Sequence, residues 1–151
     1  MSELITAFGE QNRFSSFIIK HNDFGAKSLK SLIPILERGF ARSLNKIRIV
    51  SCTTTSKVMS DLLEVLSESS NVTKLGLVEA KLTCLHMEDI KKFITQSYYL
   101  KELDLSWNAL GTKEMLDLTH VLSENTTLTY VNLSWNYLTR SETEATFEDN
   151  Y

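Results

Sequence analysis

The chain has 151 residues, of which 42% are hydrophobic and 23% charged, with five glycines and a single proline. This composition is typical of one folded domain and excludes collagen-like and low-complexity chains. The formal net charge of −3 disfavours nonspecific binding to nucleic acid or anionic lipid. No apolar stretch approaches the roughly 18–20 residues that span a bilayer, and the N-terminus lacks the features of a secretory signal. We therefore expect a cytoplasmic protein without nucleic-acid or membrane partners.

One short pattern of apolar residues occurs five times along the chain. Each copy has apolar residues at its first, fourth and sixth positions and a small or polar residue at its ninth, which is the motif LxxLxLxxN/C. The copies begin 30, 28, 28 and 28 residues apart, at Phe14, Leu44, Val72, Leu100 and Leu128. The alternation at the fourth and sixth positions predicts a short strand with one buried face in every copy. Its core positions include Leu103, Leu105 and Leu133.

Helical stretches are expected between these strands, at residues 27–39, 56–68, 87–95 and 113–124. In the last of them, apolar residues recur at steps of three and four, which indicates a helix with one buried face. Pro34 falls inside the first stretch and should kink or divide that helix, because proline removes a backbone hydrogen bond. One unit of strand and helix cannot bury both its apolar faces alone, whereas stacked units share a continuous core.

The ninth motif position begins the turn after each strand. An asparagine there can hydrogen-bond the backbone of neighbouring turns, so we expect a ladder of turn residues made by Asn22, Cys52, Asn108 and Asn136. Ala80 holds the same position in the third copy and has no polar side-chain atoms. The sequence therefore predicts a looser third turn.

Residues 100–138, LKELDLSWNALGTKEMLDLTHVLSENTTLTYVNLSWNYL, resemble leucine-rich repeats of the ribonuclease-inhibitor type, which have about 28 residues per unit. The resemblance extends over residues 14–138 and is stronger in the last two copies. It implies an α/β solenoid of about five repeats, a short horseshoe with a parallel sheet on its concave side and helices on its convex side. It does not specify a function, because this class includes enzyme inhibitors, GTPase activators, actin-capping proteins, immune sensors and ciliary components.

The two ends of the chain depart from the repeat. Residues 1–13 align with the helical half of a unit, as either a capping helix or the remainder of a longer array, and we assign residues 1–138 to the repeat domain. Residues 139–151 form an acidic tail where the next helix would be expected. The last strand would then have an uncovered edge, with uncovered apolar surface around Val131 and Leu133. The tail, a second copy of the protein or another partner could cover it.

Outward-facing motif positions form rows across the concave sheet. The three rows are Ser16, Lys46, Lys74, Glu102 and Tyr130; Ile18, Arg48, Gly76, Asp104 and Asn132; and Lys20, Val50, Val78, Ser106 and Ser134. The net charge is +3 for residues 1–75 and −6 for residues 76–151, so the molecule is a charge dipole. This asymmetry either orients a complementary partner or is an ordinary solvated surface. The candidate charged contacts are Lys46, Arg48, Lys74, Glu102 and Asp104.

Two tryptophans occupy the eighth position of adjacent copies. Trp107 and Trp135 are therefore expected to stack at the edge of the sheet. Tryptophan is enriched in interface hot spots, but a tryptophan at this position can equally pack against the neighbouring unit, and both alternatives stay open. Tyr130, on the open face, is the next candidate contact.

Patterns typical of catalysis and metal binding are missing from the sequence. His21, His86 and His120 occupy different positions of the repeat, and Cys52 and Cys84 form no CxxC pair, so we expect free thiols, no metal, no cofactor and no enzyme activity.

The leading hypothesis is a noncatalytic protein-binding module or scaffold subunit, which uses the concave sheet and the tryptophan edge within a larger complex. The alternatives are a regulator of an enzyme, as an inhibitor or small-GTPase activator, and a structural subunit of a cytoskeletal or ciliary complex.

Overall fold

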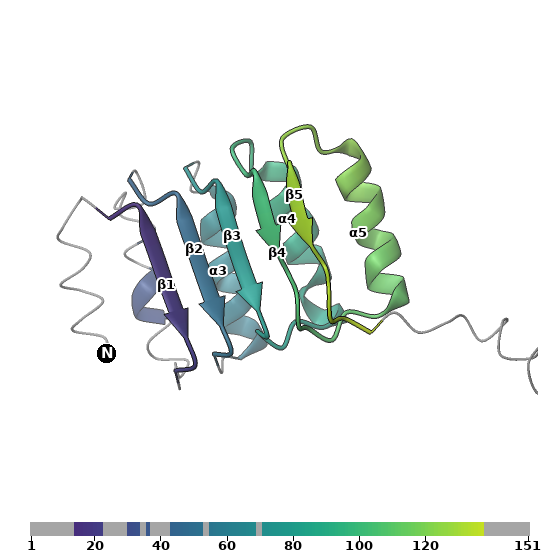
Figure 1. Cartoon of the computed structure of the whole chain (residues 1–151), viewed down its shortest axis with the longest axis horizontal. Helices are drawn as coiled ribbons and strands as arrows, with labels where there is room; N and C mark the ends of the chain where they lie inside the picture. The colour runs from purple at the N-terminus through teal and green to yellow at the C-terminus, as the bar shows by residue number, and fades with distance from the viewer. Residues whose placement is uncertain are drawn as a thin grey trace, which may run out of the picture.

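Five parallel strands form one sheet, in which their order along the sheet is their order in the chain (Figure 1). The structure, a computed structural model, describes residues 14–22, 30–33, 36, 43–52, 55–68 and 71–137. The strands are β1 (Ser16–Lys20), β2 (Lys46–Val50), β3 (Lys74–Val78), β4 (Glu102–Asp104) and β5 (Tyr130–Asn132). All five coincide with copies of the repeated motif, so the predicted parallel sheet is confirmed.

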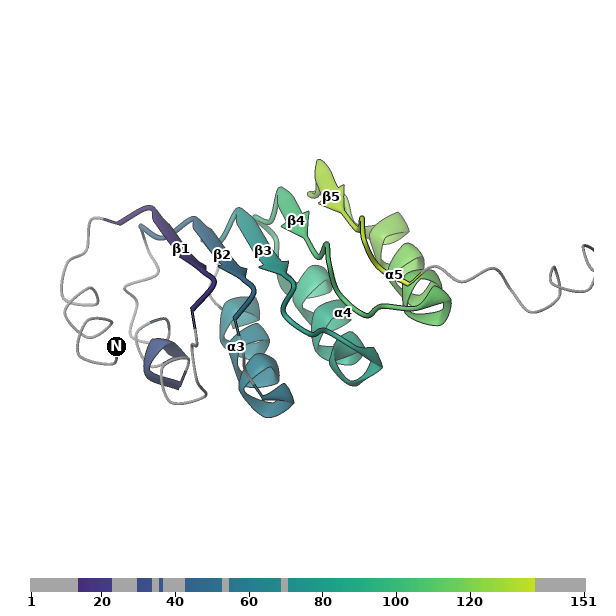
Figure 2. The same cartoon turned by 60° about the horizontal axis from the view of Figure 1, so that its bottom comes forward.

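Helices cover one face of this sheet and leave the other open (Figure 2). They are α3 (Ser56–Glu68), α4 (Met87–Gln96) and α5 (Thr112–Glu124), with a short 3₁₀ turn, η2 (Cys84–His86), leading into α4. These bounds agree with the expected stretches to within one residue. Residues 30–33 and 36 of the first stretch are also helical. In the described parts of the chain, no helix is long and apolar enough to cross a bilayer.

The core lies between the sheet and the helices. Inward residues of the strands and of the positions that follow them, such as Leu77, Leu103 and Leu105, are at most 1% exposed. They pack with helix residues such as Leu62 and Leu118. Each unit thus buries its strand and its helix against its neighbours, as a stacked repeat requires.

Leu133 departs from the expected core. It holds the same motif position as Leu105 but is only partly buried. It follows β5, which is the edge strand of the described sheet, so it has a neighbouring repeat on one side only. Leu133 therefore packs against the core but keeps part of its surface uncovered, as expected for the last strand.

The turn after each strand has a left-handed backbone at the eighth motif position. The φ angles there lie between 49° and 59°, at His21, Ser51, Glu79, Trp107 and Trp135. Residues other than glycine seldom adopt this conformation, and it costs about 1 kcal/mol or more at each position. Interactions within the turns must therefore hold the backbone in place.

Asn108 supplies such interactions from a buried side chain. Its Oδ1 accepts hydrogen bonds from the backbone N–H groups of Ala80 and Leu82, at 3.0 and 3.1 Å. Its Nδ2 donates to the carbonyls of Leu77 in the preceding repeat and Leu105 in its own, at 2.8 and 2.9 Å. The predicted role of Asn108 in linking adjacent turns is confirmed.

The other turn residues follow this pattern to different extents. Asn136 likewise bridges repeats, accepting from the N–H of Leu110 and donating to the carbonyl of Leu105. The interactions of Asn22 and Cys52 in the described structure are local, because each donates to a carbonyl two residues earlier in its own strand. The ladder between repeats is therefore confirmed for the two C-terminal asparagines.

The third turn is well bonded although it has no asparagine. Ala80 is 3% exposed, and Asn108 of the next repeat bonds the backbone on both sides of it. The prediction of a looser turn at Ala80 was wrong, because the following repeat supplies the hydrogen bonds that alanine cannot make.

Three sequence-based predictions lie outside the described residues. They are the kink at Pro34, the helical half-unit at residues 1–13 and the acidic tail at residues 139–151.

Candidate functional site

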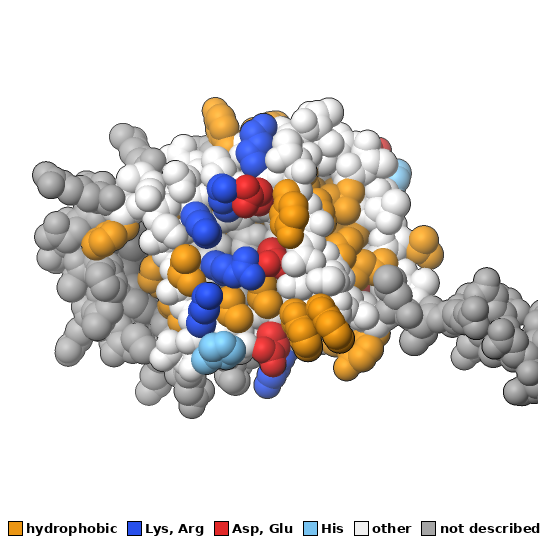
Figure 3. Space-filling view, in the orientation of Figure 1, with side chains coloured by type: hydrophobic (Ala, Val, Ile, Leu, Met, Phe, Trp, Pro, Cys, Tyr) orange, Lys and Arg blue, Asp and Glu red, His pale blue; other side chains and the backbone are white. Residues whose placement is uncertain are grey.

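The open face of the sheet, opposite the helices, presents the three predicted rows of side chains. The strand register places Lys46 beside Lys74, Lys74 beside Glu102 and Glu102 beside Tyr130. The same register aligns Arg48, Gly76 and Asp104 in the next row. Figure 3 shows basic and acidic side chains close together on this face, with apolar side chains beside them.

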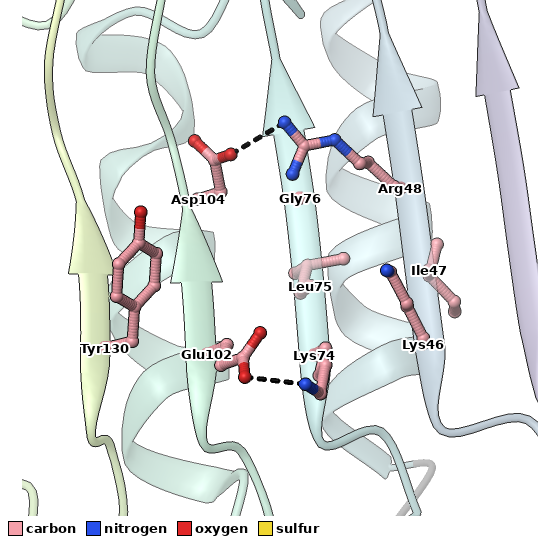
Figure 4. Close-up of a pocket in the computed structure, with 9 residues that line it drawn as sticks. All are labelled: Lys46, Ile47, Arg48, Lys74, Leu75, Gly76, Glu102, Asp104 and Tyr130. Atoms are coloured by element: carbon pink, nitrogen blue, oxygen red, sulfur yellow. Dashed lines mark hydrogen bonds and ion pairs between the residues drawn. The ribbon is translucent and has the colours of Figure 1, made fainter.

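Two ion pairs cross the open face (Figure 4). Lys74 Nζ lies 2.6 Å from Glu102 Oε1 on the neighbouring strand, and Arg48 Nη2 lies 2.9 Å from Asp104 Oδ2 two strands away. Arg48 and Lys74 of the early repeats therefore neutralise Asp104 and Glu102 of the fourth repeat. The structure thus brings four of the predicted contact residues together in pairs.

Gly76 makes room for the longer of these two connections. It lies on β3 between Arg48 and Asp104, and a Cβ atom at this position would be 3.0 Å from Arg48 Cγ. A larger residue here would require the arginine side chain to shift. A glycine here lets Arg48 lie across β3 and reach Asp104.

Asp104 is held within the surface rather than projecting from it. It is 8% exposed, and its Oδ1 also accepts hydrogen bonds from the Ser106 N–H and hydroxyl, at 3.1 and 2.6 Å. Its two carboxylate oxygens thus contact Arg48 and Ser106 of the same chain. Among the predicted contacts, Asp104 therefore has the least surface available to a partner.

A hollow of about 250 Å³ lies on the open face between the two ion pairs. Gly76 and Leu75 of β3 form part of its lining, together with Lys46 from β2 and Tyr130 from β5. Tyr130 is 54% exposed. The sequence identified both of these flanking residues as candidates, and the structure places them on one surface.

The two tryptophans stack at the edge of the sheet where the strands end. The ring centroids of Trp107 and Trp135 are 4.4 Å apart with an interplanar angle of 13°, which confirms the predicted stacking. The rings remain 52% and 68% exposed. They line an open hollow of about 410 Å³ together with Tyr137, which is also exposed. We call Trp107, Trp135 and Tyr137 the aromatic ledge.

Sequence reasoning missed Tyr137. Its position directly after the turn residue Asn136, two residues from Trp135, was the signal that could have indicated it. The equivalent residue of the preceding repeat is Ala109, which lines the same hollow.

The structure gathers no group of catalytic type in the residues it describes. His21 and His120 are exposed, whereas His86 is 3% exposed at the start of α4. The same residues contain no cluster of three side chains that could hold a metal ion. Cys52 and Cys84 are free thiols, as predicted.

Burial of His86 makes folding sensitive to pH. Burial lowers the pKa of His86, and the nearby Asp89 carboxylate opposes this only in part. The His86 side chain of the unfolded chain therefore binds a proton more readily than that of the folded chain. The free energy of unfolding is unaffected by this group above about pH 6.5 and decreases as the pH drops below that value. We expect the urea midpoint of the wild type to decrease more between pH 7.5 and pH 5.5 than that of His86→Gln. Equal decreases would refute this assignment.

Comparison with known proteins agrees with the motif and the architecture. Residues 96–113 and 124–139 match the family model described as leucine-rich repeat. The fold is a leucine-rich repeat solenoid. The finer assignment to the ribonuclease-inhibitor type stays a prediction.

A solved structure with a similar solenoid is that of leiomodin-1 actin-binding site 2, with a TM-score of 0.64 and 16% sequence identity. The match covers 76% of this chain and 66% of that chain. At this level of identity the likeness is one of fold. No curated protein is significantly similar in sequence.

Proposed function

We propose that this leucine-rich repeat protein is a noncatalytic binding module, which captures a protein partner through its open face and its aromatic ledge. The observation that carries the proposal is the exposed tryptophan stack, with rings 52% and 68% accessible. Tryptophan contributes large apolar area and a hydrogen-bond donor when an interface buries it. A protein that exposes such a cluster beside a polar face has a surface suited to protein recognition.

The geometry of the stack also supports the proposal. Both tryptophans lie at left-handed turn positions, with φ of 59°, and the turn between repeats is bonded by Asn108 and Asn136. The two rings therefore project from a rigid backbone and restrain each other. A preorganised contact loses little conformational entropy on binding, which favours affinity.

Alanine substitution of both tryptophans tests this function. We expect Trp107→Ala/Trp135→Ala to reduce capture of the partner from native extract about tenfold or more, because each ring has the character of a hot spot. Tyr98→Ala is the matched control, since Tyr98 is an aromatic residue that is 78% exposed and lies before β4, away from the ledge. Quantitative pull-down, with circular dichroism to verify folding, measures the effect. Unchanged capture by the folded double variant would remove the ledge from the interface.

A cytoskeletal partner is the second candidate. It is supported by the fold likeness to an actin-binding site of leiomodin-1, and that likeness transfers no contact residue to this chain. Cosedimentation with filamentous actin, together with a binding assay on monomeric actin, tests the candidate. Binding that Trp107→Ala/Trp135→Ala abolishes would support it, whereas no binding to either form would count against it.

Four further elements of the sequence-based hypothesis stay predictions. They are the regulation of an enzyme, membership of a larger complex, self-association through the C-terminal edge and a cytoplasmic location.

A further inference from the structure

The charges on the open face do not cancel completely. Its three outward rows contain four basic side chains and two acidic ones. The acidic residues Glu102 and Asp104 pair with Lys74 and Arg48. Within the described residues, Lys20 and Lys46 have no carboxylate at ion-pair distance. The open face is therefore net positive on a protein whose net charge is −3.

Lys46 lines the hollow and has no carboxylate at ion-pair distance in the part of the chain that the structure describes. Its side chain extends from β2 toward β3, and the two ion pairs flank the same space (Figure 4). Tyr130 lines the hollow from β5, three strands away, and presents a half-exposed ring and its hydroxyl. An ammonium group thus lies on one side of the hollow and an aromatic ring on the other.

We propose that this hollow receives an acidic side chain from an extended segment of a protein partner, with Lys46 binding the carboxylate and Tyr130 contacting the segment further along. The inference rests on the proposed binding function and names the chemistry of the partner. Lys46 and Tyr130 are about 14 Å apart at the usual strand spacing, a distance that about four residues of extended chain cover. A segment crossing the strands can therefore contact both residues at once.

The charge distribution favours an acidic protein segment over a nucleic acid. Two unpaired lysines on a face of a net negative protein are too few to bind a polyphosphate backbone, which needs many cationic contacts. They are enough to select one or two carboxylates and to set the register of a short segment. The tyrosine ring and the exposed Ile18 side chain of β1 add apolar surface suited to a peptide.

Charge variants of the full chain test the proposal in both directions. The probe is a fluorescein-labelled ten-residue peptide of alternating glutamate and alanine, measured by fluorescence anisotropy at low salt. We expect Lys46→Glu to weaken binding about tenfold or more, because it replaces attraction by repulsion. We expect Glu102→Gln to strengthen binding, because it releases Lys74 from its ion pair. Partial unfolding of Glu102→Gln could weaken peptide binding but could not strengthen it, so tighter binding would support the proposal.

Two controls match these variants. Lys113→Glu makes the same change in net charge as Lys46→Glu, but at an exposed residue near the start of α5, on the helical side. A peptide with glutamine in place of glutamate has the same length without the charge. Binding that is equal for Lys46→Glu and Lys113→Glu, or for the two peptides, would overturn the proposal. Tighter binding of a thymidine oligonucleotide than of the acidic peptide would also overturn it.

The failure of this proposal can be separated from that of the proposed function. If the acidic peptide does not bind but the tryptophan-dependent capture persists, only the acidic chemistry of the partner is refuted. If capture is also independent of both tryptophans, the proposed binding surface as a whole is refuted.

Discussion

Replacing Asn108 by alanine is expected to lower the free energy of unfolding by about 3 kcal/mol or more. The side chain is 6% exposed, and it bonds the N–H groups of Ala80 and Leu82 and the carbonyl of Leu77 across the repeat boundary. Alanine would leave these backbone groups buried without partners, and each such group costs about 1–3 kcal/mol. The effect is large because the third turn has no asparagine of its own.

Urea unfolding followed by circular dichroism measures this loss. Asn136→Ala is the matched control, because Asn136 makes the same kind of bonds but is only partly buried, so water can replace some of them. We expect a smaller loss for the control. Equal losses in the two variants would show that the special role assigned to Asn108 is wrong.

Truncation of Leu105 to alanine is the second large effect, with an expected loss of about 2–5 kcal/mol. Leu105 is 1% exposed in the shared core, so alanine would leave a cavity that close packing cannot fill. A cavity in one repeat of a solenoid also destabilises the adjacent repeats, because each repeat is stabilised by its immediate neighbours.

Leu133→Ala provides the comparison for Leu105→Ala. The two leucines hold equivalent motif positions, but Leu133 lies beside the edge strand and is only partly buried. We expect it to lose less stability, as measured by the change in urea midpoint at constant slope. A loss as large as that of Leu105→Ala would indicate that additional protein covers this edge in solution.

The pairing of charges on the open face changes how the protein can recognise a partner. The sequence places basic residues early and acidic residues late, which suggests two separate charged regions. Adjacent strands are only about 4.8 Å apart, so long side chains from early and late repeats meet across the sheet. What remains for a partner is the surplus of basic groups and the aromatic ledge.

The repeated motif by itself determined the architecture. Its period placed the strands, its apolar positions defined the core, and its eighth position predicted the Trp107–Trp135 stack, because equivalent positions of stacked units lie side by side. These features depend on local spacing that recurs along the chain. They could therefore be inferred from one sequence without knowledge of its partners.

Only the tertiary structure decided which contacts individual side chains make within that architecture. Arg48 reaches Asp104 because Gly76 leaves space above β3, and Ala80 sits in a well-bonded turn because Asn108 of the next repeat compensates for it. Each outcome depends on contacts between residues 28 to 56 positions apart in the chain, whose geometry a motif does not encode. The physical reason is that a repeat specifies the position of a side chain, whereas its conformation and pairing depend on the particular neighbours that packing brings into contact.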